Sequence, residues 1–171
     1  MKGLITVLAV LVVVGLAFFL YRAPSAPPAE MTEAEIAQIE AEAEDAIADR
    51  WTSFRTALMG SHADEFLSHW TEDMRFLEPG MNFGRDDYES LCQEVWGSGG
   101  AITAFEVGPS DTFVHGNAAY QVGQIRETLQ FPGGEPEEFY NNFFARWEKG
   151  PDGVWRVDRF VAGPVDAPAE G

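Results

Sequence analysis

The feature that most constrains this fold is a change of hydrophobic period near residue 100. Before the glycine-rich segment 97–100, apolar residues recur every three or four positions, as they do in helices that lie on a core. After it, apolar and polar residues alternate in five segments separated by turn residues, which is typical of β-strands. These segments are 102–107, 111–115, 118–131, 139–149 and 154–162. The order predicts an α+β fold with three helices packed on one face of a curved antiparallel sheet.

A long amphipathic helix opens the predicted domain. Thr32 and Glu35 form a capping box, and apolar residues then recur at helical spacing up to Leu58, shortly before Gly60. A second, short helix is expected from Ser61, with its apolar stripe at Ala63, Phe66, Leu67 and Trp70. A short strand over 75–79 and a third helix after Gly84 complete the helical half.

The first residues of the chain are a membrane-span candidate. Residues 3–21 form a run of 19 residues without a charge, 13 of them Leu, Ile, Val or Phe, which is long enough to cross the hydrocarbon core as a helix. We predict a signal anchor over 1–22, a proline-rich linker over 23–31, a folded domain over 32–163 and a disordered tail over 164–171. A cleaved signal peptide is the alternative interpretation of the run.

Charge sets the expected location and excludes several partners. Lys2 precedes the hydrophobic run, so the positive-inside rule favours an inner-membrane protein with a single span and a periplasmic or extracytoplasmic domain. Residues 23–171 hold 28 acidic residues against nine basic ones, a net charge of −19. We therefore expect no nucleic-acid partner, and membrane contact only through residues 3–21. The three histidines are scattered and no phosphate loop or dinucleotide motif occurs, so neither a metal nor a cofactor is expected.

Several motifs stand in a fixed order along the chain. HWTEDMRFLEPG occupies 69–80, FGRDDY occupies 83–88 and ARWEKGPDGVWRVDRF occupies 145–160, after a helix that carries Trp51 and Phe54. Together these motifs resemble the SnoaL-like branch of the nuclear transport factor 2 superfamily over about residues 45–162. The resemblance implies a cone in which a curved sheet and the first helix enclose an apolar pocket. It implies no single function, because one fold hosts many activities.

The resemblance also points to a candidate base. In the ketosteroid isomerases of this superfamily, the base is the acidic residue before the proline that ends this strand, and that position is Glu78 here. Desolvation by Trp51, Phe54 and Phe83 would raise its pKa towards neutrality, as proton abstraction requires. The oxyanion-binding tyrosine of the isomerases falls on Phe54, which cannot donate a hydrogen bond. Their protonated aspartate falls near Asn142, which remains as the candidate donor.

Two strands supply further candidates for the pocket wall. Alternation places Tyr140, Asn142 and Arg146 on one face of the strand over 139–147, but it does not decide which face lines the pocket. Tyr120 makes a similar case on the neighbouring strand. Arg146 is expected either to bind an anion or to form an ion pair with Glu78. The candidate ligand pocket therefore consists of Trp51, Phe54, Phe83, Tyr120, Tyr140 and Arg146.

These observations predict a membrane-anchored SnoaL-like domain that binds a small, mainly apolar molecule in its cone. The first alternative is a scaffold or oligomerisation subunit of a membrane complex, which the same fold behind one transmembrane helix also resembles. The second alternative is an isomerase or dehydratase-type enzyme that depends on Glu78. A homodimer formed through the long acidic helix is compatible with each of these functions.

Overall fold

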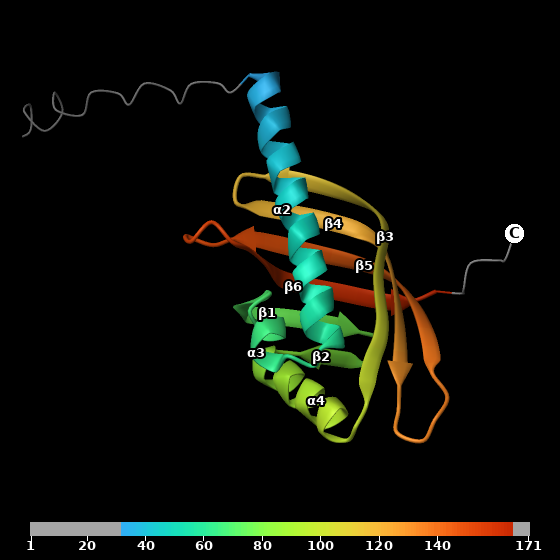
Figure 1. The fold of residues 1–171 in the computed structure, drawn as a ribbon. Coiled ribbons are helices and arrows are strands. Elements are labelled where there is room, and N and C mark those ends of the chain that lie inside the picture. Colours follow the sequence, from blue (N-terminus) through green and yellow to red (C-terminus); the bar gives the residue numbers. More distant parts are fainter. Residues whose placement is uncertain (1–31, 166–171) are drawn as a thin grey trace, which may run out of the picture. The chain divides into compact units, whose positions relative to one another are not determined.

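The fold is described from a computed structural model, in which residues 32–165 are placed (Figure 1). The chain divides into a unit that ends at Ile36 and a unit that begins at Ala37; apart from the start of the first helix, everything below concerns the second unit. The predicted anchor, the linker and residues 166–171 of the predicted tail lie outside the described residues. Within 32–165, no helix is long and apolar enough to cross a membrane.

Three helices and six strands form the domain. The helices are α2 (Glu33–Met59), α3 (Ala63–Leu67) and α4 (Arg85–Gly97). The strands are β1 (Trp70–Glu78), β2 (Met81–Phe83), β3 (Ala101–His115), β4 (Ala118–Gln130), β5 (Glu137–Lys149) and β6 (Trp155–Pro164). In Figure 1 the helices lie on one face of the sheet, and the long strands β3 to β5 curve around α2. The predicted α+β class with three helices on a curved sheet is confirmed.

The predicted first helix is also confirmed at both ends. The backbone N–H of Glu35 donates to Thr32 Oγ1 over 3.2 Å, and the backbone N–H of Thr32 donates to a Glu35 carboxylate oxygen over 2.8 Å. This is the reciprocal pairing of a capping box, which satisfies two N–H groups at the start of α2. The helix spans 27 residues and ends at Met59.

The sheet differs from the predicted purely antiparallel one. Its strand order is β2-β1-β6-β5-β4-β3, and β3 to β6 form an antiparallel meander, as the hairpin pattern indicated. β6, however, lies between β5 and β1 and runs parallel to β1. The same pairing makes β1 longer than predicted, because Trp70 pairs with Val157 and so leaves the helical stripe for the sheet. Pairing between strands far apart in sequence does not affect the local hydrophobic period. The sequence pattern therefore predicted neither the parallel β1–β6 pairing nor the full length of β1.

β3 is one bent strand where the sequence suggested two. The register with β4 shifts between Val107 and Ser110, at the Gly108-Pro109 step. Proline has no backbone N–H to donate to a neighbouring strand, so a bulge accommodates it without ending the strand. The three-residue strand β2 was not predicted. At the other end of the domain β6 runs to Pro164, and the Val165 N–H donates to the Tyr140 carbonyl over 2.9 Å.

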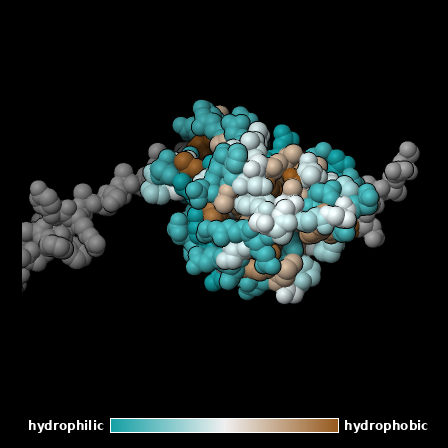
Figure 2. All heavy atoms as spheres, turned by 60° about the horizontal axis from the view of Figure 1, so that its bottom comes forward, coloured by the Kyte–Doolittle hydropathy of each residue, from teal (hydrophilic) through white to brown (hydrophobic). Residues whose placement is uncertain are grey.

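The core forms where α2 crosses the inner face of the sheet. The ring of Trp51 lies 5.2–6.2 Å, between centroids, from the rings of Phe105, Phe143, Trp147 and Phe160. All five side chains are buried, and burial of an aromatic or large aliphatic side chain stabilises a fold by about 1.5–3 kcal/mol. Seen from the α4 end, by contrast, apolar atoms appear only as small patches among hydrophilic ones (Figure 2), as expected for a chain of net charge −17.

Candidate functional site

A small cavity of about 50 Å³ lies inside the cone, between α2, α4 and the inner face of the sheet. Most of its lining is apolar: Trp51, Phe54, Leu58, Trp70, Phe76, Tyr88, Ile102, Phe105, Ile125 and Phe160. The two remaining lining residues are Glu78 and Glu127. An engineered apolar cavity of about 150 Å³ binds benzene, so this much smaller volume admits only water-sized guests. The site is therefore an apolar chamber with two carboxyl groups in its wall.

The two glutamates reach the cavity from different strands. Glu78 is the last residue of β1, held by its pairing with Met81 of β2, and Glu127 lies on β4 opposite Phe105 and Phe139. Burial raises the pKa of the Glu78 carboxyl. Burial, together with the negative charge of Glu78, raises the pKa of Glu127 to about 7. Near neutral pH the pair consequently retains a proton for part of the time.

Neither carboxyl group has a stabilising partner within residues 32–165. No cation forms an ion pair with Glu78 or Glu127, and no side-chain or backbone donor is hydrogen-bonded to either carboxylate. An ionised group withdrawn from water without a partner destabilises a fold. A carboxyl whose pKa is raised to about 7 in a cleft is a physical mark of a functional site, so Glu127, with the half-buried Glu78 in the same lining, identifies the cavity as the candidate site.

Two hydrogen-bond donors border the same cavity. Burial and the nearby groups Cys92, Glu127 and Glu78 raise the pKa of Tyr88 well above its ordinary value, so its hydroxyl keeps its proton. The Tyr88 ring stacks on Phe76 with 4.7 Å between centroids. Trp70 is only 3% exposed, and its indole N–H has no acceptor in the part of the chain that is described. Two residues that carry a hydrogen-bond donor thus line the same chamber as the two glutamates.

Of the residues singled out from sequence, the structure places Trp51, Phe54 and Glu78 together at the cavity. Phe83 lies one ring further out, because it packs on Phe76 and Tyr88 with centroid distances of 6.3 and 6.4 Å and does not itself line the cavity. Phe54 packs against Trp51 edge-on at 5.2 Å, so the position that a tyrosine holds in the isomerases is filled by hydrocarbon.

The structure places Asn142, Tyr120, Tyr140 and Arg146 on the opposite, outer face of the sheet. Alternation along β5 gives the inner face to the apolar Phe143, Ala145 and Trp147, all buried. The Asn142 carboxamide oxygen accepts a hydrogen bond from Gln124 over 3.1 Å, outside the cavity. Arg146 forms ion pairs with Asp158 and Glu148, and none with Glu78. These four residues therefore do not contribute to the cavity wall.

Glu127 is the site residue that sequence reasoning missed. Its signal was nevertheless present, because residues 119, 121, 123, 125, 127 and 129 share the inner face of β4. Glu127 is the one acidic residue in that row, between Ile125 and Leu129. A charge on the apolar face of a strand indicates either an ion pair or a functional group.

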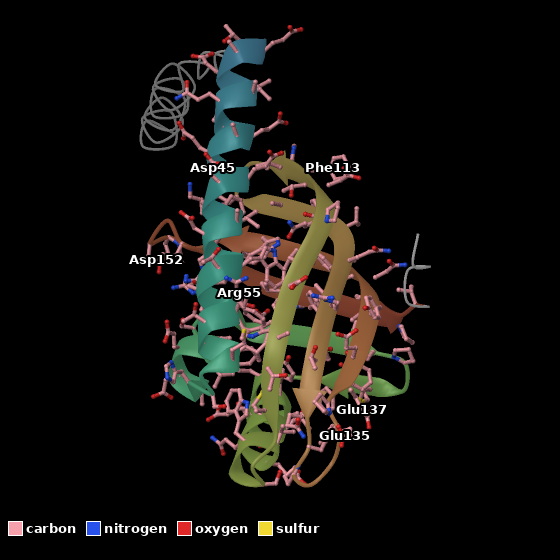
Figure 3. All side chains as sticks on the ribbon, turned by 45° about the vertical axis from the view of Figure 1, so that its right-hand side comes forward. Asp45, Arg55, Phe113, Glu135, Glu137 and Asp152 are labelled. Atoms are coloured by element: carbon pink, nitrogen blue, oxygen red, sulfur yellow. The ribbon has the colours of Figure 1, made fainter. Side chains whose placement is uncertain are left out.

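A larger hollow of about 600 Å³ is an open groove between α2 and β3 (Figure 3). Its charged lining residues, Glu44, Arg55 and Asp111, are all exposed, and Figure 3 shows Arg55 on α2 and Phe113 on β3 beside this groove. Exposed charges need no ligand to satisfy them, so the groove carries less functional information than the cavity. Within residues 32–165, no group of three His, Cys, Asp or Glu side chains is arranged to hold a metal ion.

Comparison with known proteins places this geometry in a known fold. No family model and no curated protein matches the sequence. Solved structures do match, among them an NTF2-like protein with a cystatin-like fold from Novosphingobium aromaticivorans, with a TM-score of 0.63 and 17% identity over 84% of this chain and 95% of that one. This chain has the NTF2-like cystatin fold.

Two further solved structures agree with that fold. A putative scytalone dehydratase from Novosphingobium aromaticivorans has a TM-score of 0.65 and 18% identity, covering 80% of this chain and 89% of that one. A conserved protein from Planctomyces limnophilus has a TM-score of 0.65 and 19% identity, covering 72% and 98%. At such identities the likeness is one of fold. Function has to be argued from the site itself.

Proposed function

We propose that the domain binds a small, mainly apolar molecule in the cone cavity and that Glu78 and Glu127 receive its polar group. The observation that carries this proposal is the pair of desolvated carboxyls without a cation or donor in an otherwise apolar chamber. A ligand with one hydrogen-bonding oxygen, such as a neutral ketone or alcohol, would satisfy a protonated Glu127 and the free Trp70 N–H. An anionic ligand would be repelled by the carboxylates.

Binding requires the cavity to enlarge, because about 50 Å³ holds only water-sized guests. Phe76 and Tyr88, which are half-buried and stack with 4.7 Å between centroids, line the cavity, and Phe83 packs against both from outside it. We propose that this aromatic stack moves when the cavity opens. The remaining interior is filled by Trp51 and Phe54. This close packing is what a scaffold would show, so the scaffold function remains the competing proposal.

The carboxyl pair also favours a second candidate function, proton transfer of the isomerase or dehydratase type. A general acid or base works best when its pKa lies near the working pH, and burial brings Glu127 to about 7. In a dehydration, the Glu78 carboxylate would remove the proton next to a carbonyl while Glu127 protonates the departing hydroxyl. A C–H and a C–O bond break, a C=C bond forms and water leaves.

The test uses the full chain in detergent with defined probes. Cyclohexanone serves as a neutral binding probe, and 3-hydroxycyclohexanone as a minimal substrate for loss of water. We expect saturable NMR shift changes at residues lining the cavity, weakened about tenfold or more in the Glu78→Gln/Glu127→Gln double variant and unchanged in Glu137→Gln. Glu137, labelled in Figure 3 in the β4–β5 hairpin, is exposed and does not line the cavity, which makes it a matched control. If Glu78→Gln abolishes the dehydration of 3-hydroxycyclohexanone, the result would support a catalytic role for Glu78 in addition to ligand binding. Absence of saturable binding for cyclic ketones and alcohols of six to ten carbons would refute the binding proposal.

We further propose that residues 3–21 anchor the domain to the inner membrane, with the domain on the periplasmic side. The support is the sequence alone: an uncharged run of 19 residues preceded by Lys2. The intact mass of the protein extracted from membranes should include residues 1–21. A mature chain that starts between residues 23 and 30 would show instead that the segment is a cleaved signal.

A further inference from the structure

A serine and a buried histidine are hydrogen-bonded to each other outside the cone cavity. Figure 1 shows α3 and the start of β1 beside the lower part of α2, and His69 lies in the turn that joins α3 to β1. Its Nε2 atom is 2.7 Å from the Oγ atom of Ser53 on α2. His69 is 1% exposed, whereas Ser53 is half-buried and keeps part of its surface in water. Neither residue lines the cavity that holds Glu78 and Glu127, so the pair is a separate group.

The hydrogen bonds of the imidazole ring determine which of its nitrogens carries the proton. His69 Nδ1 lies 2.8 Å from the Glu65 carbonyl oxygen and 3.3 Å from the Phe66 carbonyl oxygen. A carbonyl oxygen only accepts, so Nδ1 donates, and Nε2 of the neutral ring is left as an acceptor. The Ser53 hydroxyl has one proton and two acceptors, Nε2 at 2.7 Å and the Arg50 carbonyl oxygen at 3.2 Å. We assign the proton to the shorter contact, so Ser53 donates to His69.

His69 is available as a base at neutral pH. Burial lowers its pKa from the ordinary value of 6.5, and the positive charge of Arg50 on α2 lowers it further. The hydrogen bonds to the two α3 carbonyls and the negative charge of Glu65 act in the opposite direction without outweighing these causes. A serine hydroxyl bonded to a neutral imidazole, whose other nitrogen is held by a third group, is the arrangement that activates serine nucleophiles.

Arg50 places a cation beside the same hydroxyl. It precedes Ser53 by three positions, so the two side chains are neighbours on one face of α2. One guanidinium N–H donates to the Ser68 carbonyl oxygen over 3.0 Å, which holds the side chain at the end of α3. The Nε atom is buried and has no hydrogen-bond partner among residues 32–165. A fixed positive charge near a nucleophile stabilises the negative charge that develops on a carbonyl or phosphoryl oxygen during attack.

We propose that Ser53 and His69 form a nucleophile–base pair that transfers small acyl groups from esters to water. Ser53 Oγ attacks the ester carbonyl, and its proton passes to His69 Nε2. The carbon–oxygen bond to the leaving alcohol breaks, and the alcohol takes that proton. His69 then removes a proton from water, whose oxygen attacks the acyl-serine, and the proton returns to Ser53 Oγ as the carboxylic acid leaves. The Glu65 carbonyl holds the imidazole in the required tautomer throughout.

The test treats the full chain in detergent with diisopropyl fluorophosphate and, separately, with para-nitrophenyl acetate. We expect one covalent adduct, located by peptide mass spectrometry at Ser53, and release of para-nitrophenol. Ser53→Ala should abolish both, and His69→Gln should slow both at least ~100-fold, the usual effect of losing a general base. Ser90→Ala is the matched control and should leave both unchanged. Ser90 is also bonded to the carbonyl of a preceding helical residue, over 2.8 Å, but has no histidine partner within the described part of the chain.

The pH dependence distinguishes a base from a merely structural histidine. Labelling of the wild type should increase as His69 loses its proton, with a midpoint below pH 6.5. Arg50→Gln should move this midpoint upward, because the Arg50 charge is one cause of the lowered pKa. Alanine favours helices, so Ser53→Ala should fold, and near-UV circular dichroism of each variant verifies this. A wild type without an adduct, an adduct that persists in Ser53→Ala, or an unchanged rate in a folded His69→Gln variant would each overturn the proposal.

Discussion

Replacing Glu127 by glutamine should stabilise the domain at neutral and alkaline pH. Burial and the Glu78 charge raise the pKa of Glu127 from 4.5 to about 7 in the folded state, and this rise corresponds to about 3 kcal/mol. Well below pH 4.5 the carboxyl is protonated in both the folded and the unfolded state, so it does not change the free energy of unfolding. As pH rises from 4.5 to 7, Glu127 releases its proton more readily in the unfolded chain than in the folded one. The free energy of unfolding therefore falls, by up to about 3 kcal/mol. Glutamine never ionises, so the variant escapes this loss.

Thermal unfolding of the detergent-solubilised full chain, followed by tryptophan near-UV circular dichroism, measures this effect. A change of 1 kcal/mol shifts the melting temperature by about 2–4 °C for a chain of this size, so Glu127→Gln should melt about 6–12 °C above the wild type at pH 8. The two proteins should melt together at pH 4. Glu137→Gln, on the exposed hairpin, should match the wild type at both values. A variant that is no more stable than the wild type at pH 8, or a difference independent of pH, would refute the reasoning.

Three other substitutions test separate parts of the structure. Glu78→Gln should lower the pKa of Glu127, because the Glu78 charge is one of the two causes of its rise; an unchanged value by NMR would show that the carboxyls do not interact. Gln121→Leu removes the acceptor of two buried indole N–H groups and should destabilise the fold by about 2–5 kcal/mol in thermal unfolding, whereas Gln93→Leu on exposed α4 should stay within about 0.5 kcal/mol of the wild type. Asp158 is buried and forms ion pairs with Arg146 and Arg159, so Asp158→Asn should lower the free energy of unfolding by about 3 kcal/mol in the same assay. This is near the lower limit for buried ion pairs, because both arginines keep more than a third of their surface in water. An unchanged stability would show that these ion pairs do not stabilise the fold.

Local patterns predicted most of the secondary structure. The capping box and the 3.6-residue period determine α2 within a few neighbouring residues, so its ends could be predicted from Thr32 and Gly60. Period-two alternation similarly located β4, β5 and β6. The parallel β1–β6 pairing escaped prediction because Trp70 and Val157 are 87 positions apart, and their contact depends on how the whole sheet assembles.

The site could be predicted only in part for a related reason. Glu78 was found through its place before Pro79 in a recognisable motif, but no motif contains Glu127. Alternation along β5 separates its two faces but does not tell which of them points inward. Tertiary packing decides this, because Phe143 and Trp147 become buried beneath α2. Residues such as Arg146 therefore looked like pocket candidates although their face is the outer one.

The central claim is that Glu78 and Glu127 lie desolvated and unpartnered in one cavity. The most direct test is a carbon-13 NMR titration of the glutamate side-chain carboxyls in the full chain. The account predicts that Glu127 is half-protonated near pH 7 and that the pKa of Glu78 lies above its ordinary value of 4.5. Two carboxyls that titrate at or below 4.5 would contradict it, because both would then be solvated or paired.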